Sequence, residues 1–189
     1  YPKPDANIKY GASGFRAKAT NLERLCFRMG MLVAMRAKLT TLSGMMITAS
    51  HHPADENGTR IIEVDGSLLE PAWETLANEM ANAEDIVEWF VAFDGSGQRL
   101  NYGFMETVFA EATFSLACFA VDTRASGPAL VAAAIKGCKL MGVEPQNFGV
   151  CSTPQLHWLI ANQQTHFNCV GLYIQFFKTN YLTFLSICD

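Results

Sequence analysis

Short apolar runs of strand length alternate along this chain with longer segments of helical periodicity, and this alternation restricts the fold more than any other feature. Apolar runs at 44–49, 59–64, 114–121 and 148–151 have the length of buried strands. The segments that start near residues 21, 71 and 126 carry apolar residues three and four positions apart. Strands that alternate with helices predict an α/β layered domain, with a mainly parallel or mixed sheet flanked by helices.

Capping and turn residues suggest where these elements begin and end. Asn21 is placed to cap the first helix, Pro71 opens the second, and Ser126 caps a helix that ends at Gly142. Residues 9–16 are predicted to be a strand that runs into a glycine-rich turn, and residues 51–58, "HHPADENG", a loop. Further helices are expected at 86–93 and 102–112, separated by the loop "DGSGQR".

The composition limits the class of protein. With 189 residues the chain is long enough for one domain with a sizeable core. Only 17% of the residues are charged, against ~25% in ordinary domains, which suggests that part of the surface is covered by something else. The net charge of -4 and the lack of a basic run argue against nucleic acid as a partner. No apolar stretch reaches the ~20 residues that a membrane span needs, so no membrane partner is expected.

The cysteines and the start of the chain suggest a location. The six cysteines form no C-x-x-C pair and no framework spacing, which is typical of core thiols in a reducing compartment, so we expect a cytoplasmic protein. The chain begins at Tyr1 without a signal-peptide pattern. We therefore expect a fragment or a trimmed chain.

Polar loops are predicted to follow four of the strands. They contain Gly11 to Gly14, Ser50-His51, Asp122 to Arg124, and Ser152 to Pro154. In open α/β sheets, ligand sites lie beyond the carboxyl ends of the strands. We therefore expect these loops to converge on one site.

The same loops carry a family resemblance. The motifs "YGASGFR", "TASHHPADENG", "DTR" and "STPQLH" occur in this order with the spacing of one domain. Together they resemble the first domain of the α-D-phosphohexomutases, over about residues 8–163. The motif "TPQLH" is the most typical of the subfamily that acts on N-acetylglucosamine phosphates.

The resemblance implies a reaction. Such enzymes are intramolecular phosphotransferases (isomerases), and this subfamily interconverts N-acetylglucosamine 6-phosphate and 1-phosphate on the route to UDP-N-acetylglucosamine. A phosphoserine donates its phosphoryl group to the sugar phosphate and receives the other phosphate back. By resemblance Ser50 is that serine. A strand-end serine taken alone would be read as an ordinary surface residue.

The resemblance also implies the residues around Ser50. His51 would bond the phosphate or move a proton. Arg16, Arg60 and Arg124 would bind phosphate, because a guanidinium matches the geometry of phosphate oxygens. At three positions the sequence departs from the family: His52 stands where asparagine is usual, Val121 where arginine is usual, and Arg60 where lysine is usual.

The sequence contains only part of the magnesium site that the resemblance implies. Family members bind Mg²⁺ between the phosphoserine oxygen, here on Ser50, and three aspartates of a D-G-D-x-D-R loop in their second domain. No such loop occurs in this chain, and "FDGSG" at 93–97 is interpreted as a turn. The expected partners are therefore a sugar phosphate and the missing mutase domains, and the chain alone is expected to be inactive.

The chain is divided into two parts by the resemblance. Residues 1–163 are predicted to form the phosphoserine domain, and 164–189 a divergent, aromatic-rich C-terminal tail. The tail is either a misread end or a native partner-binding segment. Two other hypotheses stay open for the whole chain: a non-catalytic remnant or binding module derived from the mutase, and an unrelated α/β domain with similar loops by chance.

Overall fold

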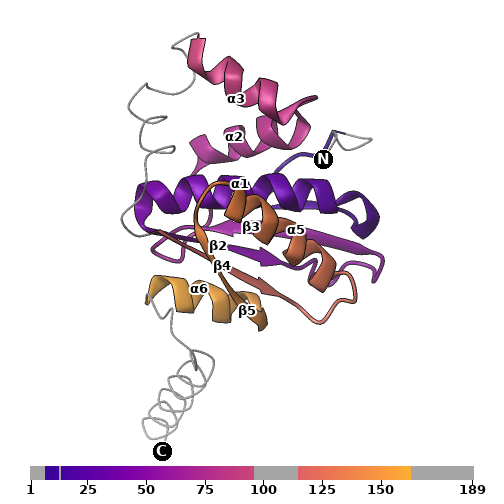
Figure 1. Cartoon of the computed structure of the whole chain (residues 1–189). Coiled ribbons are helices and arrows are strands. Elements are labelled where there is room, and N and C mark those ends of the chain that lie inside the picture. Colours follow the sequence, from indigo (N-terminus) through magenta and orange to yellow (C-terminus); the bar gives the residue numbers. More distant parts are fainter. Residues whose placement is uncertain (1–6, 13, 96–114, 163–189) are drawn as a thin grey trace, which may run out of the picture.

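The structure, a computed structural model, describes residues 7–12, 14–95 and 115–162. These residues form a five-stranded sheet with helices on both faces (Figure 1). The strand order is β1-β3-β2-β4-β5, with parallel and antiparallel pairs. The expected α/β layered domain with a mixed sheet is therefore confirmed. The predicted tail at 164–189 lies outside the described residues.

The direction of the strands determines which loops meet. The strands are β1 (Phe15–Lys18), β2 (Leu42–Ile47), β3 (Glu56–Ile62), β4 (Leu116–Val121) and β5 (Glu144–Val150). β2, β4 and β5 are parallel, whereas β3 is antiparallel to both β2 and β1. The carboxyl ends of β2, β4 and β5 therefore lie at one edge of the sheet, which we call the carboxyl edge.

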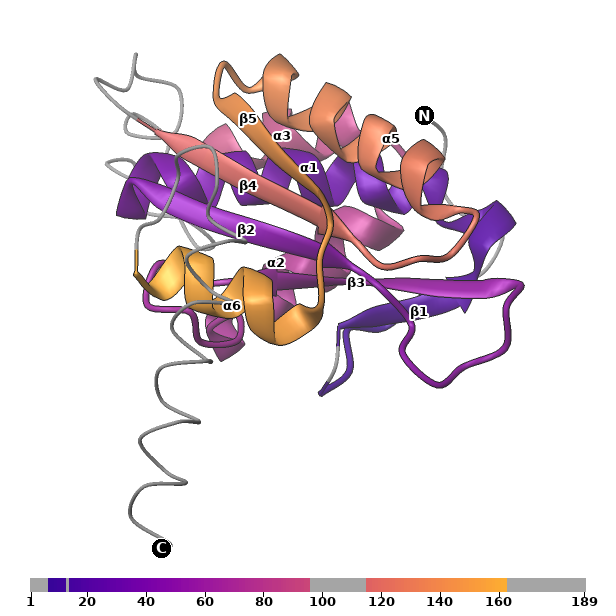
Figure 2. The same ribbon diagram turned by 90° about the horizontal axis from the view of Figure 1, so that it is seen from below.

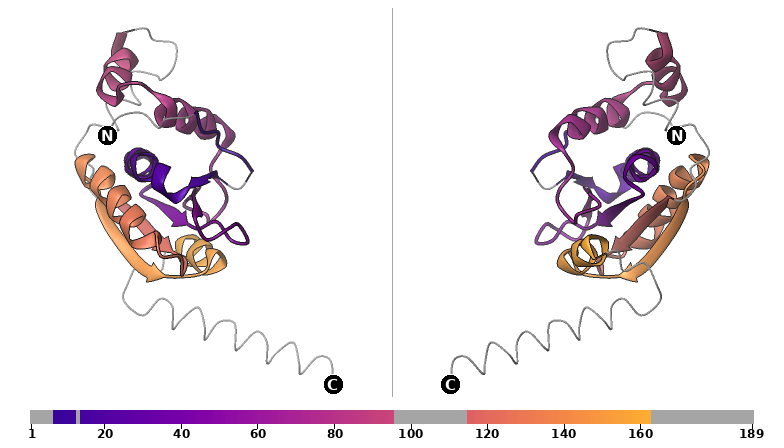
Figure 3. Two further views of the ribbon diagram at one scale, coloured as in Figure 1. Left: turned by 90° about the vertical axis from the view of Figure 1, so that its right-hand side faces the viewer. Right: turned by 90° about the vertical axis from the view of Figure 1, so that its left-hand side faces the viewer.

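The helices form layers on either side of the sheet. They are α1 (Glu23–Thr40), α2 (Pro71–Asn82), α3 (Ile86–Gly95), α5 (Gly127–Leu140) and α6 (Thr153–Ala161), with a short 3₁₀ turn, η1 (Ala19–Asn21). α1 and α5 cover one face, α6 covers the other, and α2 and α3 lie beyond α1 (Figure 1, Figure 3). Figure 2 shows α6 against the opposite face of the sheet from α1 and α5.

The two faces of the sheet bury two cores. On the α1 and α5 side, Met45, Ile47 and Phe119 are fully buried in the larger core. On the α6 side, Met46 and Ile160 belong to a smaller core. Neighbouring residues of β2 alternate between the two cores because successive side chains of a strand point to opposite faces.

α1 and α5 approach each other closely because two glycines lie at their contact. A Cβ atom at Gly30 would collide with the backbone of Ala134, and one at Gly137 would collide with the backbone of Phe27. Neither glycine has a positive φ angle, so the close approach of the helices, rather than backbone conformation, requires them.

Three strands begin well away from where the sequence predicts, and one of them, β5, starts at Glu144 instead of 148. The strand expected at 9–16 is wrong in order: the glycine turn comes first, closed by hydrogen bonds between Gly11 and Gly14 at 3.1 and 2.9 Å, and β1 follows it. β3 starts at Glu56, so Gly58, expected in a loop, pairs with Arg16. A Cβ atom at Gly58 would lie 2.5 Å from the carbonyl oxygen of Phe15. Glycine is therefore needed for the pairing of β1 with β3.

Several helix ends also differ from expectation. The residue before α1 is Leu22 rather than Asn21. Ser126 precedes α5 as predicted, but its hydroxyl accepts a hydrogen bond from the Asn57 side chain at 2.8 Å and caps no helix. α6 was not predicted, although Ser152 and Gln155 form a capping box at its start. The helix expected at 86–93 is present as α3, and the one expected at 102–112 lies outside the described residues.

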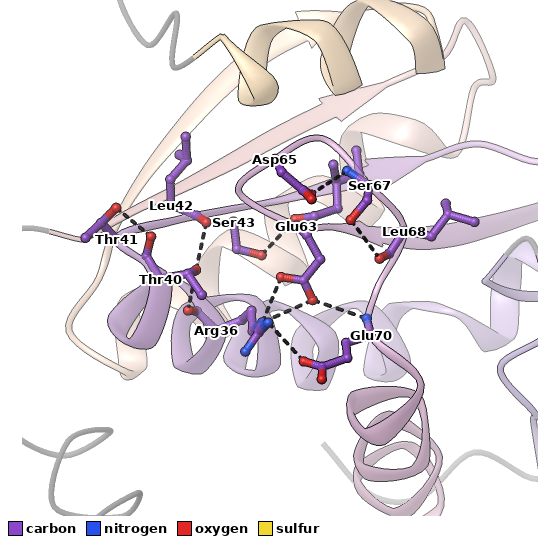
Figure 4. Close-up of polar contacts among 11 residues, drawn as sticks. Arg36, Thr40, Thr41, Leu42, Ser43, Glu63, Asp65, Ser67, Leu68 and Glu70 are labelled. Atoms are coloured by element: carbon purple, nitrogen blue, oxygen red, sulfur yellow. Dashed lines mark hydrogen bonds and ion pairs between the residues drawn. The ribbon is translucent and has the colours of Figure 1, made fainter.

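An ion-pair cluster ties α1 to the segment between β3 and α2. The Arg36 Nε–H donates to both carboxylate oxygens of Glu63 at 3.0 and 2.8 Å, and Nη2 lies 3.3 Å from a Glu70 oxygen (Figure 4). These residues line an open pocket of about 420 Å³. Because Ile62 pairs with Gly44 near the start of β2, this pocket lies at the opposite end of the sheet from Ser50.

Two expectations about the environment can be compared with the structure. The four cysteines in the described part, Cys26, Cys118, Cys138 and Cys151, are free and buried, as core thiols are. Burial raises the pKa of the Cys138 thiol to about 12, so this thiol is un-ionised near neutral pH. Among the described residues, no helix combines the length and the apolar character that crossing a membrane requires.

Candidate active site

Ser50 lies in the loop of residues 48–55 that joins β2 to β3 at the carboxyl edge, here called the serine loop. Its side chain is exposed, and its φ angle is +51°. Within the described part of the chain, Thr41 is the only other non-glycine residue with positive φ. Such a backbone costs about 1–3 kcal/mol and persists where surrounding contacts hold it. The contacts around Ser50 therefore identify what the fold stabilises.

Thr48 and Asp122 bond the backbone of Ser50 to the end of β4. The Ser50 N–H donates to the Thr48 hydroxyl oxygen at 3.1 Å, and that hydroxyl donates to Oδ2 of Asp122 at 2.7 Å. The Asp122 N–H in turn donates to the carbonyl of Ile47 at 3.1 Å. These bonds thus join the ends of β2 and β4 next to Ser50.

Arg124 reaches across the serine loop with its whole guanidinium group. Nη2 donates to the carbonyl oxygens of Ser50 at 2.6 Å and His52 at 2.8 Å, and Nη1 to those of Pro53 at 2.6 Å and Glu56 at 3.0 Å. Nε lies 3.2 Å from Oδ2 of Asp122. These are five bonds, and a guanidinium has five N–H donors. A direct contact with phosphate, as predicted for Arg124, would have to displace some of them.

Arg16 and Arg60 lie on the same face of the sheet beside the loop. Arg16 pairs with Gly58, and Arg60 lies two residues further along β3. The Nη1 of Arg16 donates to the Thr48 carbonyl at 3.3 Å. Partial burial lowers the pKa of Arg16, and the charges of Arg60 and Arg124 lower it further. Three cationic groups are therefore close enough to repel one another, and a bound anion would relieve that repulsion.

The two histidines of the loop lie against each other, with ring centroids 5.1 Å apart. His51 is exposed. Nδ1 of His52 lies 2.8 Å from Oε2 of Glu56. The histidine that stands where the family resemblance predicts asparagine is thus accommodated by a carboxylate four residues later.

The glycine-rich segment is held in place by a partly buried tyrosine. The Tyr10 hydroxyl accepts a hydrogen bond from the Ile61 N–H at 3.1 Å, and the ring packs edge-on against Phe15 at 5.0 Å. Burial raises the pKa of Tyr10 to about 12. The segment therefore leads into β1 next to β3, where it positions Arg16.

The predicted convergence of four loops is only partly found. The Asp122 to Arg124 turn contacts the serine loop directly. The glycine turn precedes β1 instead of following a strand. The Ser152 hydroxyl accepts from the N–H of Gln155 and caps α6, so its role in the described contacts is structural.

Val121 does not face the site. It is 5% exposed and belongs to the larger core. Its side chain also packs where a Cβ at Gly127 would come within 3.1 Å. An arginine in this position would point toward the α1 and α5 side of the sheet. The arginine that is usual at this position in the family would therefore not face the serine loop.

The described residues do not form a magnesium site by themselves. No group of three or more His, Cys, Asp or Glu side chains in the described ranges could hold a metal ion. The carboxylate of Asp122, which supports the serine loop, already accepts from Thr48 and Arg124. The residues present therefore do not fit Mg²⁺, which prefers several oxygen ligands in a near-ideal octahedron.

Residues that sequence reasoning assigned no role prove to shape the site. Thr48 and Asp122 support Ser50, and the buried Asn57 connects β3 to Ser126. All three lie inside the recognised motifs "TASHHPADENG" and "DTR". Their position in those motifs was the signal, but the contacts join parts of the chain about 70 residues apart and are not visible in sequence.

Comparison with known proteins agrees with this geometry. A family model described as phosphoglucomutase/phosphomannomutase, alpha/beta/alpha domain I, matches residues 98–174, which extends past Gln163. A crystal structure of an N-acetylglucosamine-phosphate mutase in its product complex superposes with a TM-score of 0.74 at 33% identity, over 85% of this chain. The chain has the alpha/beta fold of a phosphohexomutase domain I and is similar to that domain in sequence.

Curated relatives of this chain come from animals, fungi and plants. Phosphoacetylglucosamine mutase of Sus scrofa is 36% identical over 169 residues, and that of Homo sapiens 34% identical over 167, each over 87% of this chain. The chain spans about 29% of the length of these relatives. A mutase structure from Aspergillus fumigatus, in complex with GlcNAc-6P and magnesium, has a TM-score of 0.68 at 33% identity and is covered over 28% of its length.

Proposed function

We propose that this domain I supplies the phosphoryl carrier, Ser50, of a phosphoacetylglucosamine mutase reaction. The reaction interconverts N-acetylglucosamine 6-phosphate and 1-phosphate, and its product is a precursor of UDP-N-acetylglucosamine. The observation that carries the proposal is the exposed Ser50, held at positive φ in a loop that Arg16 and Arg124 contact, with Arg60 close enough to Arg16 to lower its pKa. Relatives with this domain are named for that activity, and one was solved with GlcNAc-6P.

The side chains present divide the work in this proposal. The Ser50 hydroxyl attacks a phosphorus atom of a sugar bisphosphate, the bond from that phosphorus to the sugar oxygen breaks, and the serine proton ends on the released sugar oxygen. Arg16 and Arg60 stabilise the charge on the transferring phosphoryl group. His51, exposed beside the serine, is proposed to carry the proton. A cytoplasmic location belongs to the same proposal.

Magnesium enters the proposal only as a requirement of the reaction. When bound, Mg²⁺ would neutralise charge on the transferring phosphoryl group. Since the described residues lack the necessary ligand set, we expect no turnover by this chain alone with N-acetylglucosamine 6-phosphate, Mg²⁺ and a sugar bisphosphate. Turnover that disappears in Ser50→Ala would contradict this expectation while supporting the assignment of Ser50.

The test of the carrier is the modification of Ser50 itself. We expect intact mass and peptide mapping of the protein from its native source to show phosphate on Ser50. Phosphate on another serine, or none on Ser50 in material with mutase activity, would refute the assignment. An unmodified Ser50 in inactive material would favour the alternative, a non-catalytic binding module.

A further inference from the structure

Arg124 differs from the other two arginines in how its donors are used. All five of its N–H groups have acceptors: four backbone carbonyls of residues 50–56 and the carboxylate of Asp122. Its side chain is 11% exposed. In contrast, Arg16 donates one long hydrogen bond, of 3.3 Å, to a described residue. An anion can therefore bind Arg16 without breaking protein contacts, whereas it would compete with the loop for Arg124.

Most of the carbonyls that accept hydrogen bonds from Arg124 belong to the serine loop, which has few backbone-to-backbone hydrogen bonds. Residues 48–55 make four backbone-to-backbone hydrogen bonds: the N–H groups of Thr48 and His52 donate to Gly58 and Ala49, and the carbonyls of Pro53 and Asp55 accept from Glu56 and Ala19. The guanidinium thus supplies donors to the Ser50 and His52 carbonyls, and it adds a second bond to the Pro53 carbonyl, which already accepts from the Glu56 N–H. Bonds to a charged donor are about twice as strong as neutral ones.

Asp122 keeps Arg124 in this position. One carboxylate oxygen accepts from the Arg124 backbone N–H at 3.0 Å, and the other accepts from its Nε at 3.2 Å and from the Thr48 hydroxyl at 2.7 Å. The same Thr48 oxygen accepts from the Ser50 N–H. Thr48 therefore bonds the N–H of Ser50, Arg124 bonds its carbonyl oxygen, and Asp122 connects the two side chains.

We propose that Arg124, Asp122 and Thr48 are positioning residues that hold the Ser50 backbone in its left-handed conformation, and that Arg124 does not bind the phosphate. The proposal rests on the proposed function of Ser50 as phosphoryl carrier, since a fixed Ser50 backbone restricts the position of the hydroxyl that would carry the phosphoryl group. Positioning of this kind matters because phosphoryl transfer depends on alignment of the attacking oxygen.

The test uses the whole chain without any ligand. Backbone NMR shifts and the H–N to Hα coupling of Ser50 report its φ angle, and amide exchange of Ser50, His52 and Glu56 reports the order of the loop. We expect Arg124→Lys to move the Ser50 shifts and to speed exchange of these amides by about tenfold or more, because an ammonium offers three donors in place of five. Arg36→Lys, at the opposite end of the sheet from Ser50, is the matched control and should leave both readouts unchanged.

Thr48 provides a pair of variants that separates the hydroxyl from the shape of the side chain. Thr48→Val keeps the shape but removes the hydroxyl, so exchange of the Ser50 amide should rise about tenfold. Thr48→Ser keeps the hydroxyl and should restore slow exchange and the wild-type Ser50 shifts. A general packing role would predict the reverse order, since valine preserves packing better than serine.

The outcomes distinguish this proposal from the proposed function. Wild-type Ser50 shifts and loop exchange in Arg124→Lys, together with weaker binding of inorganic phosphate, would overturn it in favour of a phosphate ligand. If Arg124→Lys does not fold, the Thr48 pair decides, and equal exchange in Thr48→Val and Thr48→Ser would overturn the proposal. Absence of phosphate on Ser50 would end the proposed function but would not alter these ligand-free readouts.

Discussion

At the scale of single residues, a buried arginine shows how one side chain can connect distant helices. Arg28 on α1 is fully buried, and its Nη1 donates to the carbonyls of Met80, Ala81 and Ala83 at 3.0, 3.0 and 2.8 Å. These carbonyls lie at the end of α2, where the last helical carbonyls lack partners within the helix. A cation there also interacts favourably with the helix dipole.

We expect Arg28→Met to lower the free energy of unfolding by about 3 kcal/mol or more, because buried carbonyls would lose their donor. Urea unfolding followed by circular dichroism measures this. The control is Lys136→Met at an exposed position of α5, which should change stability by less than about 0.5 kcal/mol. Similar stability of the two variants would contradict the assignment.

Val121 tests the direction of another side chain. Because it is 5% exposed and packs in the larger core, we expect Val121→Arg to destabilise the chain by about 3 kcal/mol or more without strengthening phosphate binding. Thermal unfolding and a titration with inorganic phosphate measure the two effects. Thr123→Arg places the same group on an exposed neighbour and should be nearly neutral for stability. Tighter phosphate binding in a stable Val121→Arg chain would show that position 121 faces the site.

At the scale of elements, α6 is attached to the turn after β3 by a histidine. Nδ1 of His157 lies 2.6 Å from the Gly66 carbonyl oxygen. Gly66 has a φ angle of +80°, and a Cβ there would lie 2.7 Å from Ala161 on the same helix. Burial lowers the pKa of His157, and the charge of Arg60 lowers it further, while the bond to Gly66 opposes the change. The folded state therefore favours neutral His157.

This predicts a pH dependence of stability. Below the ordinary histidine pKa of about 6.5, the unfolded chain takes up a proton that the folded chain resists. The stability that neutral His157 contributes is thus complete above about pH 6.5 and is lost as the pH falls toward its lower folded pKa. Urea unfolding at neutral and acidic pH should show a smaller acid loss in His157→Gln than in the wild type. An equal acid loss in both would disprove the role of His157.

The contact of α1 with α5 provides a second prediction for elements. Gly30→Ala would favour helix formation by up to about 1 kcal/mol at a permissive site. Here the added methyl collides with the Ala134 backbone, so we expect a net loss of about 1–3 kcal/mol. Chemical unfolding measures the change. A gain in stability would mean that the two helices separate easily.

At the scale of the whole molecule, the sheet separates two functional environments. The carboxyl edge carries the serine loop and its arginines, and the opposite end carries the ion-pair cluster of Arg36, Glu63 and Glu70. The described part of the chain offers cationic groups but no cluster of metal-binding side chains. Anion binding by this domain should therefore be electrostatic and independent of metal.

We expect the chain to bind inorganic phosphate with the same Kd in excess Mg²⁺ as in a chelator, and more weakly as ionic strength rises, because salt screens partly exposed charges. Titration followed by NMR at several salt concentrations measures both dependences. Arg16→Met should weaken binding. Binding that needs Mg²⁺ would show that the chain holds the metal after all.

The layered fold followed from sequence because its causes are local. Apolar runs of strand length, Pro71 at the start of α2 and Gly142 after α5 act through neighbours in the chain. The strand bounds were less accurate, since β3 starts at Glu56 only because Gly58 allows β1 to approach. α6 was missed although its capping box is local.

Sequence by itself determined the α/β class and drew attention to Ser50, Arg16, Arg60 and Arg124, because these residues stand in motifs with recognisable order. Only the tertiary structure decided how they differ. In the folded chain Val121 lies in the core, and Arg16 keeps donors available. All five donors of Arg124 bond the serine loop, Glu56 or Asp122. The physical reason is that a hydrogen bond depends on distance and direction between atoms. The partners Thr48 and Asp122 are 74 residues apart in the chain and become neighbours only when β2 and β4 pair.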